Sequence, residues 1–481
     1  MKVMIIVPPR VGGVPVVRTE RFEHRDLGAI YPPINCLYLA ALLEKEGHEV
    51  SLIEANAFDL TLDYIKKETE RIKPDVVFAR TGFDTQEEDI KVLEIAKEHG
   101  AHTLLRCKII AEVPHIRDAL LEKPFIDIFI NEEPESIVPG LLKKISHSGS
   151  WKDAPGISFR EKGKIITTPP GNRLTAPDDM PFPAYHLLPN IKPYHTGIMM
   201  RPPFTTVISS RGCPFSCTFC SYGNAKYRTR SPENVVAELE WLVDRYGIKR
   251  FIFFDEMIFL HDGRIDEICK LMLEKGLKLR WTLNSRVKPL NLETLKLMKK
   301  AGCFEICFGI ESGSNKILEN IEKGITTDDV KEAARLCRKA DLDIYAMMLI
   351  GSPGETEETI NESIKLIQQI DPFYTQFSFV VPAPNAPGFD YYRNNNLLLT
   401  EKWSDYCPIE EKPIIRTEAL SPEDLIRLRS KCYRETQLNV AHFFRKVKKI
   451  DWSLIHWGEN IKILKIIWKR VSSILKNRMV R

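Results

Sequence analysis

The stretch that decides the fold is Arg211-Gly212-Cys213-Pro214-Phe215-Ser216-Cys217-Thr218-Phe219-Cys220-Ser221. It places three cysteines at C-x3-C-x2-C spacing, directly after an apolar run at 205–209 that predicts a buried strand. A loop of this kind can wrap its thiolates around one iron–sulfur cluster. A four-iron cluster with three protein ligands leaves one iron open to an exogenous ligand, and this vacancy suits chemistry better than a purely structural role.

Two other uses of clustered cysteines fit this stretch less well. A disulfide framework needs an oxidising compartment and usually an even, spread-out set of cysteines, whereas this triplet is odd and clustered. A structural zinc site normally closes with four ligands, and no nearby Cys or His pair completes the triplet at zinc-finger spacing. The sequence therefore favours an iron–sulfur cluster with an open iron.

The cysteine motif resembles that of the radical S-adenosylmethionine (SAM) superfamily, and residues 1–390 resemble the branch in which a cobalamin-binding-type domain precedes the catalytic one. The resemblance implies a [4Fe-4S] cluster held by Cys213, Cys217 and Cys220, with SAM as the second cofactor. It also implies a partial (β/α)6 barrel for the catalytic domain.

Length and composition set the broad class. The chain has 481 residues, which predicts two or three domains, and a net charge of +4, which by itself indicates neither nucleic acid nor membrane. Eleven cysteines without an export signal indicate a reducing, cytoplasmic location, because thiols there bind metal or pack as small hydrophobes. No run of about 18 apolar residues occurs, so we expect no segment that spans a bilayer.

The first domain, residues 1–150, is expected to be a doubly wound, Rossmann-like α/β domain. Apolar runs that predict strands alternate with patterns that predict helices, and this alternation favours a parallel sheet whose ligand lies at the carboxyl ends of the strands. The strands are expected at 3–7, 50–54, 75–79, 103–106 and 126–130, and the helices at 37–47, 87–99 and 135–146.

This half resembles a cobalamin-binding domain in its Pro8-Pro9 turn, its Tyr31–Ala40 helix entry and its Glu46–Val50 turn. Where relatives carry glycine-rich turns, however, it has Ala111-Glu112-Val113-Pro114-His115 and Asn131-Glu132-Glu133-Pro134-Glu135. It also lacks the Asp-x-His-x-x-Gly motif of a lower axial histidine. Larger side chains hinder the approach of backbone to a flat macrocycle. The resemblance makes cobalamin a candidate cofactor. These departures favour the alternative, in which the domain keeps the fold without binding cobalamin.

Residues 151–198 are expected to form a hairpin followed by a proline-rich linker, and residues 199–390 the radical SAM partial barrel. Reacting groups in such a barrel project from the carboxyl ends of its strands. The barrel strands are expected at 205–209, 250–254, 279–284, 304–310, 343–350 and 374–381, and the helices at 232–246, 263–275, 291–300, 315–321, 327–339 and 356–369.

Polar residues follow several of these strands. Asp255 and Glu256 end a buried strand, where carboxylates need a cationic or donor partner, and Arg286 can form a two-pronged bond to a carboxylate. A helix N-cap pair is the alternative for the two carboxylates, and an exposed helix-end lysine is the alternative for Lys323. The resemblance implies a SAM site made of Phe219 and the Gly351–Pro353 turn at adenine, Asp255 or Glu256 at the methionine ammonium, Arg286, Glu311 at the ribose, Ser312 beside it, and Lys323 at the carboxylate.

The last region, residues 391–481, is expected to be helical and to end in a basic amphipathic tail. From residue 441 onward, eleven Lys and Arg residues face two acidic ones, which gives this part a charge of +9. The apolar and basic stretch 461–476 could lie on an anionic membrane surface or pack on the barrel with its lysines in solvent. We therefore expect a cytoplasmic protein, with membrane association as the alternative.

The resemblance implies a reaction in which the reduced cluster cleaves SAM and a 5′-deoxyadenosyl radical takes hydrogen from an unactivated carbon of a small-molecule or lipid substrate. A donor such as ferredoxin or flavodoxin would supply the electron. Bound cobalamin would direct the reaction to C-methylation; without it, cyclisation or another carbon–carbon bond formation stays open. The competing classes are a non-catalytic iron–sulfur or corrinoid carrier, which has no need of a SAM site, and a nucleic-acid modifier, for which we find no tRNA-binding module.

Overall fold

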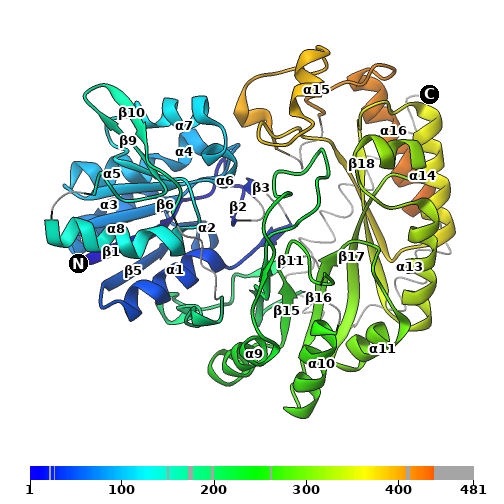
Figure 1. The fold of residues 1–481 in the computed structure, drawn as a ribbon, viewed down its shortest axis with the longest axis horizontal. Coiled ribbons are helices and arrows are strands. Elements are labelled where there is room, and N and C mark those ends of the chain that lie inside the picture. Colours follow the sequence, from blue (N-terminus) through cyan, green and yellow to red (C-terminus); the bar gives the residue numbers. More distant parts are fainter. Residues whose placement is uncertain are drawn as a thin grey trace.

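The computed structural model describes residues 1–437 except 21–22, 26–27, 149–150, 172–176, 197–199, 261–262 and 408–411. Figure 1 shows two α/β units side by side, the N-terminal one on the left and the second on the right. The basic stretch expected at 461–476 lies outside the described residues. Among those residues, no helix is long and apolar enough to cross a bilayer.

The first unit is built on the expected parallel sheet. Its strands β1 and β6 are apolar and buried along almost their whole length, because helices cover both faces of the sheet. The parallel strands are β1 (Lys2–Val7), β5 (Glu49–Glu54), β6 (Val76–Arg80), β7 (His102–Arg106) and β8 (Ile128–Ile130). The helices are α1 (Ile34–Lys45), α2 (Ala55–Phe58), α3 (Leu62–Ile72), α4 (Gln86–Asp89), α5 (Lys91–Glu98), α6 (Lys108–Ala111), α7 (Pro114–Leu121) and α8 (Pro134–Ser148).

The strand order in this sheet is β10-β9-β8-β7-β6-β1-β5. The chain leaves β1 toward β5 on one side and returns to β6 on the other, so the direction of winding changes between β1 and β6. In open α/β sheets the ligand crevice lies at such a point, outside the carboxyl ends of the strands.

The hairpin of β9 (Ile157–Glu161) and β10 (Lys164–Thr167) differs from its expected place in the linker. It pairs antiparallel with β8 and so extends the first sheet. Ile157 and Phe159 are buried there, and the hairpin covers what would otherwise be an exposed edge strand. The linker proper therefore begins after Thr167.

The second unit is the expected partial barrel, a six-stranded sheet in the order β12-β15-β16-β17-β18-β19 with parallel neighbours throughout. Its strands are β12 (Phe204–Val207), β15 (Arg250–Phe253), β16 (Arg280–Ser285), β17 (Cys303–Glu311), β18 (Asp343–Ile350) and β19 (Tyr374–Phe379). Its helices are α9 (Pro232–Tyr246), α10 (Arg264–Glu274), α11 (Leu292–Lys300), α12 (Asn315–Asn320), α13 (Thr327–Lys339) and α14 (Glu357–Ile370), followed by α15 (Phe389–Asn394) and α16 (Pro422–Gln437).

Three short strand pairs that the sequence did not signal lie outside the two main sheets. They are β2 (Val16–Arg18) with β3 (Glu23–Arg25), β4 (Ala29–Ile30) with β11 (His195–Thr196), and β13 (Ser210–Arg211) with β14 (Arg228–Thr229). The last pair closes the base of the cysteine loop.

A buried polar contact fixes the two units to each other. The hydroxyl of Tyr38 in α1 donates to Glu238 in α9 at 2.9 Å, and Arg230 pairs with the same carboxylate at 2.6 Å. The Glu238 side chain is fully buried, so this contact is shielded from screening by solvent.

Candidate active site

The cysteine loop folds tightly on itself between β13 and β14. Cys213, Cys217 and Cys220 all carry free thiols. Two backbone bonds, from Ala225 N to Cys213 O and from Asn224 N to Phe215 O, each measure 2.9 Å and draw the ends of the loop together. A Cβ atom on Gly212, whose φ is +88°, would lie 2.3 Å from Lys226 O, so this close approach requires glycine.

Two cations face the thiols. Burial raises the pKa of both Cys213 and Cys220, while nearby Arg286 lowers that of Cys213 and Lys323 lowers that of Cys220. Within the described residues, no three Cys, His, Asp or Glu side chains converge as a single-ion site would require. The ligands of a four-iron cluster bind separate irons and need not converge on one point, so the loop fits a cluster.

Arg286, which follows β16, contacts the loop directly. Its Nη1 donates to Cys217 Sγ at 3.4 Å, its Nη2 donates to Lys323 O, and its guanidinium lies 3.9 Å from the centre of the Phe215 ring. The structure therefore gives Arg286 a thiol, a carbonyl and an aromatic ring as partners.

The two carboxylates after β15 have different environments. Gly212 N donates to Glu256 Oε2 at 3.2 Å, so Glu256 faces the cysteine loop. Asp255 is 1% exposed and accepts bonds from Ser209 N at 2.7 Å and Ser210 N at 3.1 Å, and burial raises its pKa. Asp255 thus holds the turn before the loop, and only Glu256 joins the site.

A buried ion pair lies beside the loop. Lys323 Nζ is 2.7 Å from Glu311 Oε1, with side-chain exposures of 7% and 9%, and it lies 5.4 Å from the centre of the Phe219 ring. Glu311 has a φ of +70° at a bulge between β17 and β18. A Cβ on Gly309 would lie 2.6 Å from Glu311 Oε1 and 2.9 Å from Lys323 Nζ, so glycine leaves the room that the pair needs. Lys323 is not the exposed helix-end lysine of the alternative interpretation.

Ser312 is not brought to this group. Its side chain is fully buried, and its Oγ accepts from Ser314 N at 3.2 Å and lies 3.4 Å from Ser363 Oγ in α14. The hydroxyl therefore joins the strand end to the covering helix.

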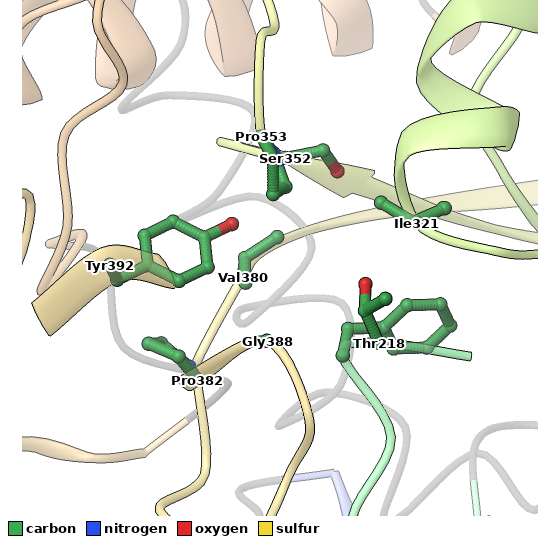
Figure 2. Close-up of a pocket in the computed structure, with 9 residues that line it drawn as sticks. Thr218, Ile321, Ser352, Pro353, Val380, Pro382, Gly388 and Tyr392 are labelled. Atoms are coloured by element: carbon green, nitrogen blue, oxygen red, sulfur yellow. The ribbon is translucent and has the colours of Figure 1, made fainter. Parts of the chain in front are cut away.

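A hollow lies beside the cysteine loop, between Thr218 and Tyr392 (Figure 2). Its lining comes from the cysteine loop, the α12 end, the turn after β18, the segment after β19, and α15. The lining residues are Thr218, Phe219, Ile321, Ser352, Pro353, Val380, Pro382, Gly388 and Tyr392. The predicted residues Phe219 and Pro353 thus line one hollow with mostly apolar walls.

The turn that forms one wall of this hollow is held from behind. Gly351 N and Ser352 N both donate to Glu355 Oε2, and Tyr392 donates to Gly351 O at 2.9 Å. Burial raises the pKa of Glu355 to about 7. Gly351 has a φ of +95°, and a Cβ there would lie 2.4 Å from Ile415 Cδ1, so Gly351 shapes the turn.

Several residues that line the hollow are not identified by any sequence motif. Gly388 N donates to Thr218 O at 2.7 Å and Thr218 N donates to Ile321 O at 3.0 Å, which ties the cysteine loop to two distant segments. A Cβ on Gly388 would lie 2.9 Å from Thr218 O. Only the proline-rich composition after β19 could have marked this segment, and nothing local points to Tyr392.

The element Asn131–Glu135, at the carboxyl end of β8, also contacts the catalytic unit. Arg211 Nη2 donates to Glu135 Oε1 at 2.7 Å, and Arg228 Nη1 donates to Glu133 Oε2 at 3.0 Å. Lys108 Nζ lies 4.3 Å from the centre of the Tyr222 ring. The first unit therefore forms ion pairs with residues at both ends of the cysteine loop.

Comparisons with known proteins give the family of this chain. The radical SAM superfamily model matches residues 207–367. An uncharacterized methyltransferase of Pyrococcus horikoshii is 33% identical over 440 residues, which cover 90% of this chain and 92% of that protein. This chain belongs to the radical SAM superfamily. An anaerobic magnesium-protoporphyrin IX monomethyl ester cyclase of Cereibacter sphaeroides is 27% identical over 429 residues, 87% of this chain and 69% of that protein.

Among solved structures, the radical SAM methyltransferase TsrM from Kitasatospora setae, with cobalamin and a [4Fe-4S] cluster bound, superposes with a TM-score of 0.68 at 17% identity. The match covers 95% of this chain and 89% of TsrM, and it confirms the two-unit fold. As a radical SAM protein, the chain is an enzyme that uses a [4Fe-4S] cluster and SAM, acts on a substrate and needs an electron donor. The carrier alternative is thereby removed.

Proposed function

We propose that Cys213, Cys217 and Cys220 hold the [4Fe-4S] cluster and that the residues around their loop bind SAM. The observation that carries this proposal is the convergence of the Glu311–Lys323 pair, Phe219 and Arg286 on one loop with three free thiols. When bound, the reduced cluster supplies the electron that splits SAM into methionine and a 5′-deoxyadenosyl radical.

Each group around the loop has a matching part of SAM. Glu256, beside Gly212 N, suits the methionine ammonium, and Lys323 suits the carboxylate. Glu311 can accept hydrogen bonds from the ribose hydroxyls. The hollow beside Phe219 suits adenine, because its walls are mostly apolar and Pro353 removes a backbone donor from one side.

The chain also tunes the environment of its thiols. Arg286 donates to Cys217 Sγ, and hydrogen bonds to the sulfurs are one of the means by which proteins set cluster potentials. The guanidinium lies against Phe215, which shields it from water. Arg286 is thus a positioning residue whose loss should shift the reduction potential.

We further propose that the radical takes hydrogen from an unactivated carbon of a small-molecule or lipid substrate. The names of the relatives point to two outcomes, methyl transfer and ring closure. The side chains at the carboxyl edge of the first sheet favour the second. Arg18, Arg80 and Arg106 are buried there with acidic partners, where a corrinoid would need space, so we derive no step through that group.

Anaerobic reconstitution tests the proposal. The full-length protein should bind about four irons per chain and, with dithionite and SAM, release 5′-deoxyadenosine and methionine. Replacing Cys213, Cys217 or Cys220 with Ala should abolish both the cluster absorption and the release. Cys337→Ala, at a buried free cysteine in α13, is the matched control and should keep both. Full cleavage by the loop variants would disprove the ligand assignment.

A further inference from the structure

The ligand crevice of the first sheet lies between the carboxyl ends of β1 and β6, where the winding direction changes. Figure 1 shows β2 and β3 between this sheet and the barrel. Residues 16–20, comprising β2 and the two residues after it, form what we call the strap. The strap supplies the two side chains that decide what the crevice can hold.

The first of these side chains is Arg18, which joins the two strand ends directly. It donates to Pro8 O at 3.1 Å and Pro9 O at 2.9 Å, just after β1, and its Nε donates to Asp89 Oδ2 at 2.9 Å. Asp89 in turn accepts from Gly82 N at 2.9 Å, just after β6. Both side chains of the Arg18–Asp89 pair are 1% exposed, so among the described residues this pair occupies the switch point.

The second is Glu20, which occupies the adjacent position along the edge. Arg106, at the end of β7, donates from Nη2 to Glu20 Oε2 at 3.0 Å and from Nη1 to Ile130 O and Asn131 O, and Arg80, at the end of β6, pairs with the same carboxylate. Both arginines are almost fully buried. Removing one partner of such a buried network leaves an uncompensated charge, so a ligand would have to displace it at high cost.

His102 offers no lower axial ligand at this edge, because it is the first residue of β7 and lies at the amino end of the sheet. In place of a corrinoid, the neighbouring part of the edge holds the cysteine loop through the Glu133–Arg228 and Glu135–Arg211 pairs.

We infer that the strap occupies the cofactor crevice of the first domain and that this enzyme works without cobalamin, using the domain to brace its cysteine loop. The consequence of this inference for the reaction rests on the proposed function. A radical reaction with no methyl donor in the crevice leads to cyclisation or carbon–carbon bond formation. The occupation of the crevice itself rests on the strap contacts alone.

The first test is reconstitution of the full-length protein with iron, sulfide and hydroxocobalamin, followed by desalting and separate assays for iron and corrinoid. A cobalamin-binding radical SAM enzyme is treated in parallel as the positive control. We expect a full iron content with corrinoid at background level. One corrinoid retained per chain would overturn the inference.

A second measurement follows the strap directly. Hydrogen exchange of residues 16–20 and 80–89 is compared with and without hydroxocobalamin, and we expect identical protection in both states. A change confined to these residues would show that the strap yields to the corrinoid and would overturn the inference. Release of 5′-deoxyadenosine, measured without corrinoid on the same sample, reports the proposed function separately: its absence from a protein with a full cluster would reject that function and leave the corrinoid result standing.

Discussion

The buried ion pair between Lys323 and Glu311 offers the sharpest test of the SAM site. Its side chains are 7% and 9% exposed, so Lys323→Met would leave a buried carboxylate without its cation. Breaking a buried pair in this way costs about 3–5 kcal/mol. Lys296→Met removes a lysine whose pair with Glu293 is 47% and 82% exposed, and it should cost at most about 1 kcal/mol.

The assay is urea unfolding of the apo-protein, followed by tryptophan fluorescence, since Trp281 is fully buried in the same barrel. The double variant Lys323→Met/Glu311→Gln should lose less stability than the sum of the single variants, because neither charge is then left unpaired. Each single variant should also bind SAM at least tenfold more weakly in equilibrium dialysis of the reconstituted protein, a loss of about 1.4 kcal/mol. A Lys323→Met loss equal to that of Lys296→Met, or strict additivity, would refute the reasoning.

Three further predictions concern the turn at Gly351, the two carboxylates after β15 and the basic stretch 461–476. The pKa of Glu355 is about 7 in the folded protein, above the value of 4.5 expected for the unfolded chain, so the native form binds the extra proton between these values and stability should fall as pH rises through them. Glu355→Gln should flatten that slope in thermal melts, and an unchanged slope would contradict the assignment. Glu256→Gln should weaken SAM binding with little change in melting temperature, whereas Asp255→Asn should mainly lower the melting temperature; the reverse pattern would exchange their roles. We also propose that the basic stretch 461–476 binds anionic membranes, so the full chain should sediment with phosphatidylserine vesicles at low salt and a chain ending at residue 437 should not; equal sedimentation would assign the binding elsewhere.

The fold could be predicted from the sequence because its strands are apolar runs of the right length. The strand expected at 343–350 matches β18 residue for residue, and the alternation of strands and helices in the barrel fixed its parallel order. The hairpin at 157–167 was placed in the linker because its pairing with β8 depends on a distant strand. Local sequence patterns predict the individual strands and helices well, but they predict less well which strands pair with each other.

Within the candidate site, the sequence located the strand ends but not the directions of the side chains. Asp255 and Glu256 are neighbours with the same charge, and only the backbone donors of Ser209 and Ser210 separate them. Ser312 follows Glu311, yet its hydroxyl faces Ser363 in α14, whereas the Glu311 carboxylate pairs with Lys323. Tyr392 reaches the hollow from α15, which lies at the start of the region expected to be helical.

The side chains of the strap show that similarity in fold does not determine which ligand the first domain binds. A doubly wound sheet brings its strand ends together whatever side chains follow them, so its match to TsrM depends on the backbone and not on the crevice. Arg80 and Arg106 each end an apolar strand and individually resemble ordinary surface arginines in the sequence. Only when Glu20 lies between them do they become a buried network that competes with a cofactor for the same space. The contents of such a crevice therefore have to be determined from side chains that are distant in the sequence, even where the fold is certain.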